Sequence, residues 1–272
     1  MTAADDYRAR IEAVSAQQSR LSAGPRADTW GQRAARFRMD PRRPIDRNLE
    51  ALASFVEPGD VVIDVGGGAG RVSLPLALRC REAVNVEPSP GMGEQFLASA
   101  AEAGIANARL VAADWMAAEG VVGDVTVVCN VTYFIAGIVP FVERLIAASR
   151  RRVIIGVWSV PPPDHHARLF RVVHGEEQER VPGHRELLAV LWEMGLLPDV
   201  RVLPEPFQFR LPTPPTREET VAAWLDQFNL RDRETAARRV EANFDSLFRH
   251  TEEGYEPTWR PDAREMLITW AT

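Results

Sequence analysis

An acidic residue followed by a run of glycines is the stretch of this sequence that could do chemistry. Asp64 interrupts a β-branched run over residues 61–65, and Gly66, Gly67, Gly68 and Gly70 follow it. Glycines allow a tight turn with positive φ and let a ligand approach the backbone closely. The apolar residues between 72 and 77 predict a buried helix behind the turn. A strand, a glycine turn and a helix form the first half of a nucleotide-binding βαβ unit.

The glycine spacing separates two classes of nucleotide ligand. In a dinucleotide fingerprint, Gly-x-Gly-x-x-Gly, that starts at Gly66, the third glycine would fall at position 71, which is Arg71. The pattern is instead Asp64-x-Gly66-x-Gly68-x-Gly70. A turn with only a structural role is the less favoured interpretation, because burying a carboxylate at a strand end is costly unless something pairs with it.

Polar residues also end three later predicted strands. Glu87 ends a strand over residues 83–86 and stands 17 residues after Gly70, near the distance expected of a ribose-binding acid. A strand over 110–115 ends in Asp114 and Trp115, and one over 124–130 ends in Asn130. The alternative for Glu87 is a solvated acid at a strand end.

The alternation of strands and helices predicts the fold class. With a fifth strand over 152–158, five apolar strands alternate with helices, which is typical of a parallel, doubly wound α/β sheet. Before them we expect helices over 3–22, 30–37 and 46–56. After them we expect a loop over 161–182, a helix over 183–195, a strand within 200–211, helices over 216–229 and 232–249, and a final strand over 266–270.

Taken together, these motifs resemble class I S-adenosylmethionine (SAM) dependent methyltransferases over about residues 45–200 plus the final strand. The resemblance implies a seven-stranded, mostly parallel, doubly wound sheet whose last strand is antiparallel and lies between the fifth and sixth. We expect a SAM-binding domain over residues 45–272. Outside the resemblance, we also expect N-terminal helices forming a cap over residues 1–44 and a helical lid over about 212–258, between the sixth and last strands.

The resemblance assigns the contacts to SAM to residues at the strand ends. Asp64 with Gly66, Gly68 and Gly70 would hold the methionine part through water or backbone contacts, and Glu87 would bind the ribose hydroxyls. Further contacts are implied for Pro88, Ser89, Asp114, Trp115 and Asn130. Of these, Asp114 would take the adenine amino group, Trp115 would offer its backbone N–H or its ring, and Asn130 would contact the methionine amino group through its carbonyl.

Methyl transfer from a sulfonium needs few catalytic groups, because the methyl group already carries a good leaving group. In-line displacement then depends on holding a nucleophile close and dry. Candidates for a general base are His165, His166 and Tyr133, with His174 and Asp164 as further choices. The plainer interpretations are exposed imidazoles in a polar turn and a tyrosine packed under the lid. The spacing of the histidines does not indicate a metal site.

Composition restricts the partners and the compartment. The 32 basic and 38 acidic residues give a net charge of −6, which disfavours nucleic acid as a partner. Two cysteines, Cys80 and Cys129, predict neither a disulfide framework nor a metal set. We see no signal peptide and no apolar run of about 18 residues, so a cytoplasmic protein without a membrane span is expected. The oligomeric state, a homodimer included, is left open.

Three functions remain open. The leading hypothesis is methylation of an O or N atom of a small-molecule acceptor. Methylation of RNA or protein is the second, because seven arginines stand against three aspartates between Arg26 and Arg47. That stretch is interpreted first as a solvated face, and second as a cap over the cofactor or an acidic acceptor with Trp30 as a wall. The third is a non-catalytic SAM-binding regulator.

Overall fold

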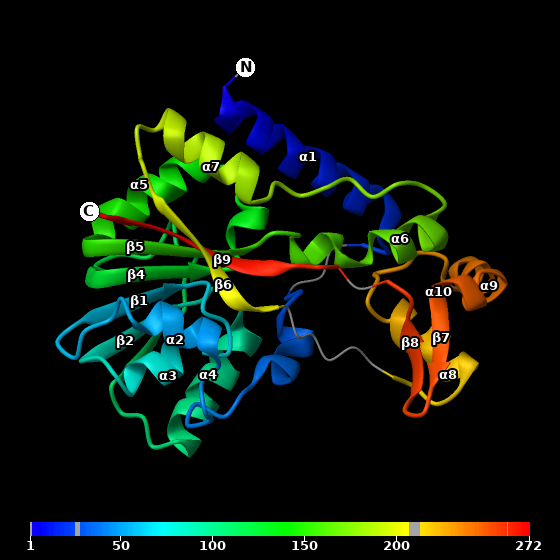
Figure 1. The fold of residues 1–272 in the computed structure, drawn as a ribbon, viewed down its shortest axis with the longest axis horizontal. Helices are drawn as coiled ribbons and strands as arrows, with labels where there is room; N and C mark the ends of the chain where they lie inside the picture. The colour runs from blue at the N-terminus through cyan, green and yellow to red at the C-terminus, as the bar shows by residue number, and fades with distance from the viewer. Residues whose placement is uncertain (1, 25–27, 207–212, 260) are drawn as a thin grey trace.

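A seven-stranded sheet forms the centre of the molecule (Figure 1). The computed structural model describes residues 2–24, 28–206, 213–259 and 261–272. Across the sheet the strands run β3 (Ala108–Val111), β2 (Glu82–Val86), β1 (Val61–Val65), β4 (Gly123–Cys129), β5 (Ser149–Trp158), β9 (Arg264–Ala271) and β6 (Asp199–Pro206). The first five are mutually parallel, and β9 pairs antiparallel with both β5 and β6. The predicted sheet and the inserted last strand are confirmed.

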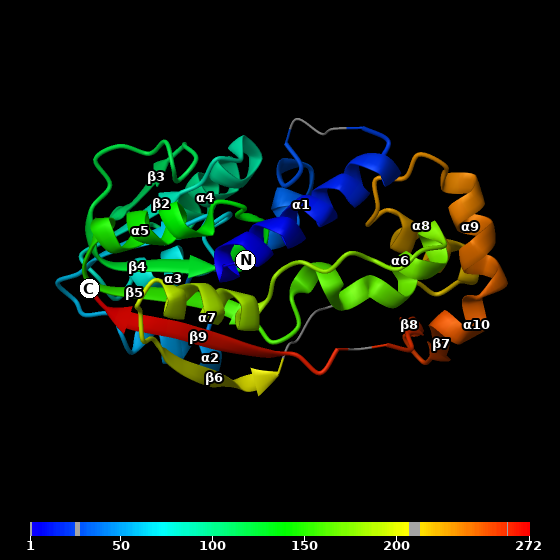
Figure 2. The same cartoon turned by 90° about the horizontal axis from the view of Figure 1, so that it is seen from above.

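Helices cover both faces of the sheet, because alternate residues of its buried strands point to opposite sides. Ile63 and Val65 of β1 join a core formed with α1 (Ala3–Leu21), α5 (Ile138–Ala148) and α7 (His184–Glu193), whereas Val62 joins the core on the other face. The latter is covered by α2 (Arg47–Ala53), α3 (Ser73–Ala77) and α4 (Pro90–Glu102). Figure 2 shows α1 lying across α5 and α7. This layering explains the unbroken apolar run of β1.

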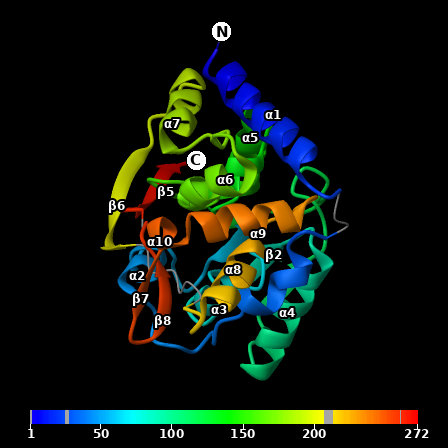
Figure 3. The ribbon, with the colours of Figure 1, turned by 90° about the vertical axis from the view of Figure 1, so that its right-hand side faces the viewer.

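A third apolar core lies beyond the carboxyl ends of the parallel strands (Figures 1 and 3). It is built by α6 (Ala167–His174), α8 (Arg217–Leu225), α9 (Arg233–Ala242), α10 (Phe244–Leu247) and the hairpin β7 (Phe248–Thr251)–β8 (Gly254–Pro257). We call α8–α10 and this hairpin the lid. The helices predicted between the sixth and last strands are present, and the hairpin was not predicted.

Two further predictions about the elements are wrong. Residues 161–182 were expected to be a loop, but they hold a 3-10 turn, Pro162–His166, and then α6, whose Leu169 and Val173 pack into the lid core. The helix expected to reach residue 249 ends earlier, because β7 begins at Phe248. The predicted sixth strand is β6, and residues 207–211 of that prediction lie outside the described residues.

A short N-terminal segment lies against the carboxyl edge of the sheet. It runs from Asp28 through the 3-10 helix η1 (Gly31–Phe37), which contacts α4. Ala34 of η1 is buried against Ala69 of the glycine turn and Met92 of α4. We call residues 28–37 the strap.

Candidate active site

The glycine turn between β1 and α3 is closely packed on its flank toward β4. Gly66 has φ +67°, and a methyl group at this position would lie 2.5 Å from Cγ2 of Val131, in the loop after β4. Only glycine combines this backbone conformation with so close an approach. The turn is thus held between the strap on one side, through Ala34 and Ala69, and the loop after β4 on the other.

Asp64 supports the turn from behind rather than facing solvent. Its side chain is 1% exposed, and Oδ2 accepts a hydrogen bond from the backbone N–H of Ser73 at 3.2 Å. Burial raises the pKa of Asp64 to about 6, opposed by the hydrogen bonding of Ser73. A ligand beyond the turn could therefore reach this carboxylate only through backbone or water.

Asn85 is a supporting residue that the sequence analysis missed. It is fully buried in β2, and its Nδ2 donates to the carbonyl of Gly68 at 2.9 Å, while its Oδ1 has no hydrogen-bond partner among the described residues. A methyl group at Gly67 would lie 2.4 Å from Oδ2 of Asp64 and 2.5 Å from Oδ1 of Asn85, so the two oxygens crowd the underside of the turn. An asparagine within an otherwise apolar strand was the signal for this role.

Glu87 sits at the tip of β2 with its carboxylate directed to the turn. Its Oε2 accepts from the N–H of Gly68 at 3.0 Å and its Oε1 from the N–H of Ser89 at 2.8 Å. Burial raises its pKa, and these two N–H groups oppose that effect. A carboxylate has about four acceptor positions, so two remain for ligand hydroxyls. A methyl group added at Gly68 would meet only Sδ of Met92, at 3.7 Å, which leaves space beside this acid.

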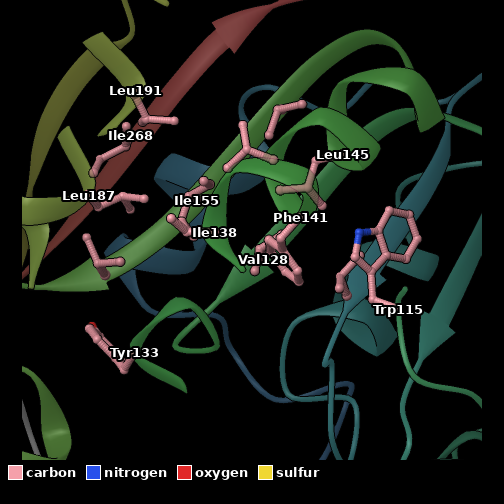
Figure 4. Packing of buried hydrophobic residues seen from close by; sticks show 14 of the residues in the cluster. Trp115, Val128, Tyr133, Ile138, Phe141, Leu145, Ile155, Leu187, Leu191 and Ile268 are labelled. Atoms are coloured by element: carbon pink, nitrogen blue, oxygen red, sulfur yellow. The ribbon is translucent and has the colours of Figure 1, made fainter. Parts of the chain in front are cut away.

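Asp114 and Trp115 lie past the end of β3, which stops at Val111. Asp114 is exposed, and its Oδ1 accepts from the N–H of Met116 at 2.8 Å, so it stabilises its own turn. The Trp115 ring is 4% exposed in the core beside Leu145 (Figure 4), with the Arg144 guanidinium 5.1 Å from its centroid. The ring is thus buried, and of the two predicted contacts the backbone N–H is the one we retain as a proposal.

Asn130, at the tip of β4, has an unusual backbone conformation. With φ +64° it is the one non-glycine residue of positive φ among the described residues. Such conformations cost about 1–3 kcal/mol and concentrate at functional sites. Its N–H donates to the carbonyl of Gly156 at 2.9 Å, which fixes the turn into the following loop.

Tyr133 is buried in the core and its hydroxyl is already engaged (Figure 4). The hydroxyl accepts from the N–H of Trp158 at 2.6 Å and donates to Oδ1 of Asn130 at 3.5 Å. Burial raises the pKa of Tyr133, so the phenol stays neutral. The hydroxyl of Tyr7 in α1 supports the same loop by donating to the carbonyl of Thr132 at 2.7 Å. Tyr133 thus ties the loops after β4 and β5 together.

The two histidines after β5 face protein rather than solvent, in contrast to the plainer interpretation of the sequence. Nε2 of His165 lies 2.8 Å from the carbonyl oxygen of Val160, and burial lowers the pKa of His165. His166 packs edge-on against Trp224 of the lid, with ring centroids 5.2 Å apart. Burial lowers its pKa to about 4. These contacts place the His165 ring against the segment after β5 and the His166 ring against the lid.

The strap is fastened beside Glu87 by a carboxylate that the sequence analysis did not single out. Asp28 accepts from the Ser89 hydroxyl at 2.8 Å and from the N–H of Gly91 at 3.2 Å. Ser89 is the N-cap of α4, where its Oγ also accepts from the N–H of Met92. Pro88 links this cap to Glu87, so the second strand tip and the strap meet at one point.

Within the described residues, no three His, Cys, Asp or Glu side chains gather as a metal-binding set. Across the same part of the chain, no helix has both the length and the apolar character needed to cross a bilayer.

Solved structures share this architecture at low sequence identity. YcgJ from Bacillus subtilis superposes with a TM-score of 0.53 and 16% identity over 83% of this chain and 97% of that one. A SAM-dependent methyltransferase from Thiobacillus denitrificans, in complex with S-adenosyl-L-homocysteine, gives 0.52 and 17% over 91% and 99%. YjhP from Escherichia coli gives 0.51 and 13% over 89% and 98%.

Sequence comparison reaches only part of the chain. No protein-family model matches it. A 23S rRNA (uracil(1939)-C(5))-methyltransferase from Alkalilimnicola ehrlichii is 40% identical over 73 residues, which are 27% of this chain and 16% of that protein. The match thus covers a small part of the relative's length. The observed strand order and the similarity to these solved structures show that this chain has the fold of the class I S-adenosylmethionine-dependent methyltransferases.

Proposed function

We propose that the protein is a methyltransferase that binds SAM at the glycine turn and methylates an O or N atom of a small-molecule acceptor. The observation that carries the proposal is the Glu87 carboxylate, 7% exposed, held by the N–H groups of Gly68 and Ser89 with two acceptor positions left. Burying an acid at a strand tip is costly, and a ligand with a pair of hydroxyls would use it fully.

The residues present fit this cofactor. Glu87 would bind the ribose hydroxyls, and the turn from Gly66 to Gly70 would contact the methionine part, with Asp64 and Asn85 supporting it from below. Asn130 would contact the amino group through its carbonyl. When bound, SAM supplies a methyl group on a sulfonium leaving group.

The protein itself would then position the acceptor and exclude water from the reacting atoms. Holding a nucleophile in line is worth up to about 7–11 kcal/mol in effective-molarity terms. Of the three predicted bases, Tyr133 is a buried phenol whose hydroxyl is already engaged, His165 is buried with a lowered pKa, and His166 packs against the lid. We therefore propose that positioning, rather than a general base from these three, provides the rate enhancement.

The test is calorimetric titration of the full chain with SAM and with S-adenosylhomocysteine. We expect both to bind, and Glu87→Gln to weaken binding of S-adenosylhomocysteine by about 10–100-fold, because a charge-assisted hydrogen bond contributes about 1.5–3 kcal/mol. The matched control is Glu82→Gln, at the opposite end of the same strand, where the acid pairs with Arg109 on the surface. Equal affinity of the wild type and Glu87→Gln for S-adenosylhomocysteine would show that Glu87 is not part of the site. If neither SAM nor S-adenosylhomocysteine binds, the proposal that SAM is the cofactor is refuted.

RNA is the second candidate acceptor, favoured by the local match to an rRNA methyltransferase. It predicts RNA binding that weakens steeply with salt and further with Arg36→Gln and Arg47→Gln, two exposed arginines of the N-terminal region. Deleting residues 1–44 would be a poor test, because it removes the buried Tyr7 and with it a support of the site. Salt-independent or absent RNA binding would leave the small molecule as the acceptor.

A further inference from the structure

Three half-exposed aromatic side chains lie together beside the candidate cofactor site. Trp30 is 47% exposed, Phe37 39% and Phe134 45%. The Trp30 ring meets Phe37 edge-on at 6.1 Å and Phe134 edge-on at 6.0 Å between centroids. Phe134 in turn meets the buried Tyr133 at 6.2 Å. Neighbouring large apolar groups left in contact with water are a sign of a binding surface rather than of stability.

The position of these rings follows from the two segments that flank the glycine turn. Trp30 and Phe37 belong to the strap, which rests on the turn through Ala34 and Ala69. Phe134 belongs to the loop after β4, whose Val131 approaches Gly66. The contact of Trp30 with Phe134 therefore joins the two flanks of the turn.

The strap holds Trp30 and Phe37 in a fixed place. Asp28 is bonded to Ser89 and Gly91, and a methyl group at Gly91 would lie 2.6 Å from Cα of Gly31, so strap and α4 touch without a gap. At the lid side, Arg33 donates to the carbonyl of Asp226. Because the strap is anchored at both ends, little conformational entropy is lost in ordering it when a ligand binds.

We propose that Trp30, Phe37 and Phe134 form the wall of the acceptor site, and that the acceptor presents an uncharged planar aromatic ring next to its methylated atom. The proposal rests on the proposed methyl transfer. Rings near 70° to one another expose both faces and edges, and aromatic groups pair by edge-to-face or offset contacts at 4.5–7 Å. The three rings carry no charge. Of the strap's charged groups, Asp28 is bonded to Ser89 and Arg33 to Asp226, while Arg36 is exposed, and Arg38, just after the strap, pairs with Glu102.

The test uses 2-naphthol as the probe and decahydro-2-naphthol as its saturated counterpart, each titrated into the full chain saturated with S-adenosylhomocysteine. We expect 2-naphthol to bind at least about tenfold more tightly than the saturated alcohol, and Trp30→Ala and Phe134→Ala each to weaken it about tenfold. The control is Trp192→Ala, a tryptophan 58% exposed on α7, for which binding should not change. Affinity for S-adenosylhomocysteine should stay within about threefold in all variants.

The outcomes separate the two proposals. Equal binding of the two alcohols, no binding of 2-naphthol, or unchanged binding in Trp30→Ala would overturn the aromatic wall while leaving the cofactor site intact. If S-adenosylhomocysteine does not bind, the proposed function fails, and the same titrations without it still decide whether Trp30 holds a planar ring. Because Trp30 is half exposed, its replacement is decisive even if Phe134→Ala proves unstable.

Discussion

Replacing Asp64 by Asn should stabilise the protein at neutral pH, although it removes a charge that the fold places beside its site. The carboxyl group is 1% exposed, and burial raises its pKa from 3.8 to about 6. A proton is therefore held more tightly in the folded than in the unfolded state. Between about pH 4 and pH 6 the folded protein loses stability as the pH rises, because Asp64 ionises. Above pH 6 the full destabilisation by the buried carboxylate persists.

The size of the effect follows from the same pKa. A rise from 3.8 to about 6 corresponds to about 3 kcal/mol for the ionised group, and no discount for solvent applies at this burial. In Asp64→Asn, the amide oxygen can still accept from Ser73. The amide N–H₂ can donate to Oδ1 of Asn85, which has no partner and lies close to the same point under the turn. The variant should therefore be more stable by up to about 3 kcal/mol at pH 7 and about equal to wild type at pH 4.

Urea unfolding of both proteins from pH 4 to pH 7.5 measures this difference. Asp124→Asn is the contrasting control, since the pKa of Asp124 is lowered from 3.8, chiefly by the N–H of Val61; its loss should destabilise the protein by about the same amount from pH 4 to pH 7.5, because the folded pKa lies below this range. A difference between Asp64→Asn and wild type that does not change with pH would refute the raised pKa. A variant less stable at every pH would mean that the carboxylate's bonds outweigh its burial.

Two further predictions concern the supports of the site. Gly66→Ala should destabilise the protein and weaken binding of S-adenosylhomocysteine, because the new methyl group meets Val131 at 2.5 Å; Gly104→Ala, with a similar φ and nothing within 4 Å, should cost only the backbone strain. Equal losses of stability in the two variants would contradict the close approach. Tyr7→Phe leaves the buried carbonyl of Thr132 without its donor and should cost about 1–3 kcal/mol in urea unfolding. A loss below about 0.5 kcal/mol would show that α1 does not support this loop.

Much of the sheet could be predicted, because its signals are local. The β-branched run before the glycines, the apolar strands at regular intervals and the final apolar strand each carry their own pattern. The elements beyond the sheet were harder to predict. Pro161, Pro162 and Pro163 favoured a loop and concealed α6, which is helical because its apolar side enters the lid core. The β7–β8 hairpin likewise gains its stability from packing between distant helices.

The candidate site likewise contains residues that local sequence signals predict and residues whose placement depends on distant parts of the chain. Asp64, Glu87 and the glycines could be placed from spacing alone, because Asp64 lies near the end of β1 and the others follow a strand directly. The orientation of Trp115 could not, since β3 ends at Val111 and the chain then turns the ring into the core. The packing of His166 depends on Trp224 of the lid, and the role of Asp28 depends on Ser89, 61 residues away. No local pattern encodes such pairs.

Ser89 connects the proposed cofactor site with the proposed acceptor site. Its N–H holds Glu87 and its hydroxyl holds Asp28, so one residue stands between the acid proposed for the ribose and the strap that carries Trp30. A ligand at either site that restricts the motion of Ser89 would lower the entropy cost of binding at the other site. Such coupling is reciprocal by thermodynamic necessity. A nucleoside on Glu87 would thus slow hydrogen exchange of the strap amides, and a ring against Trp30 would slow release of the nucleoside. The order in which the two substrates arrive would then matter for the rate, even though they need not touch the same side chain.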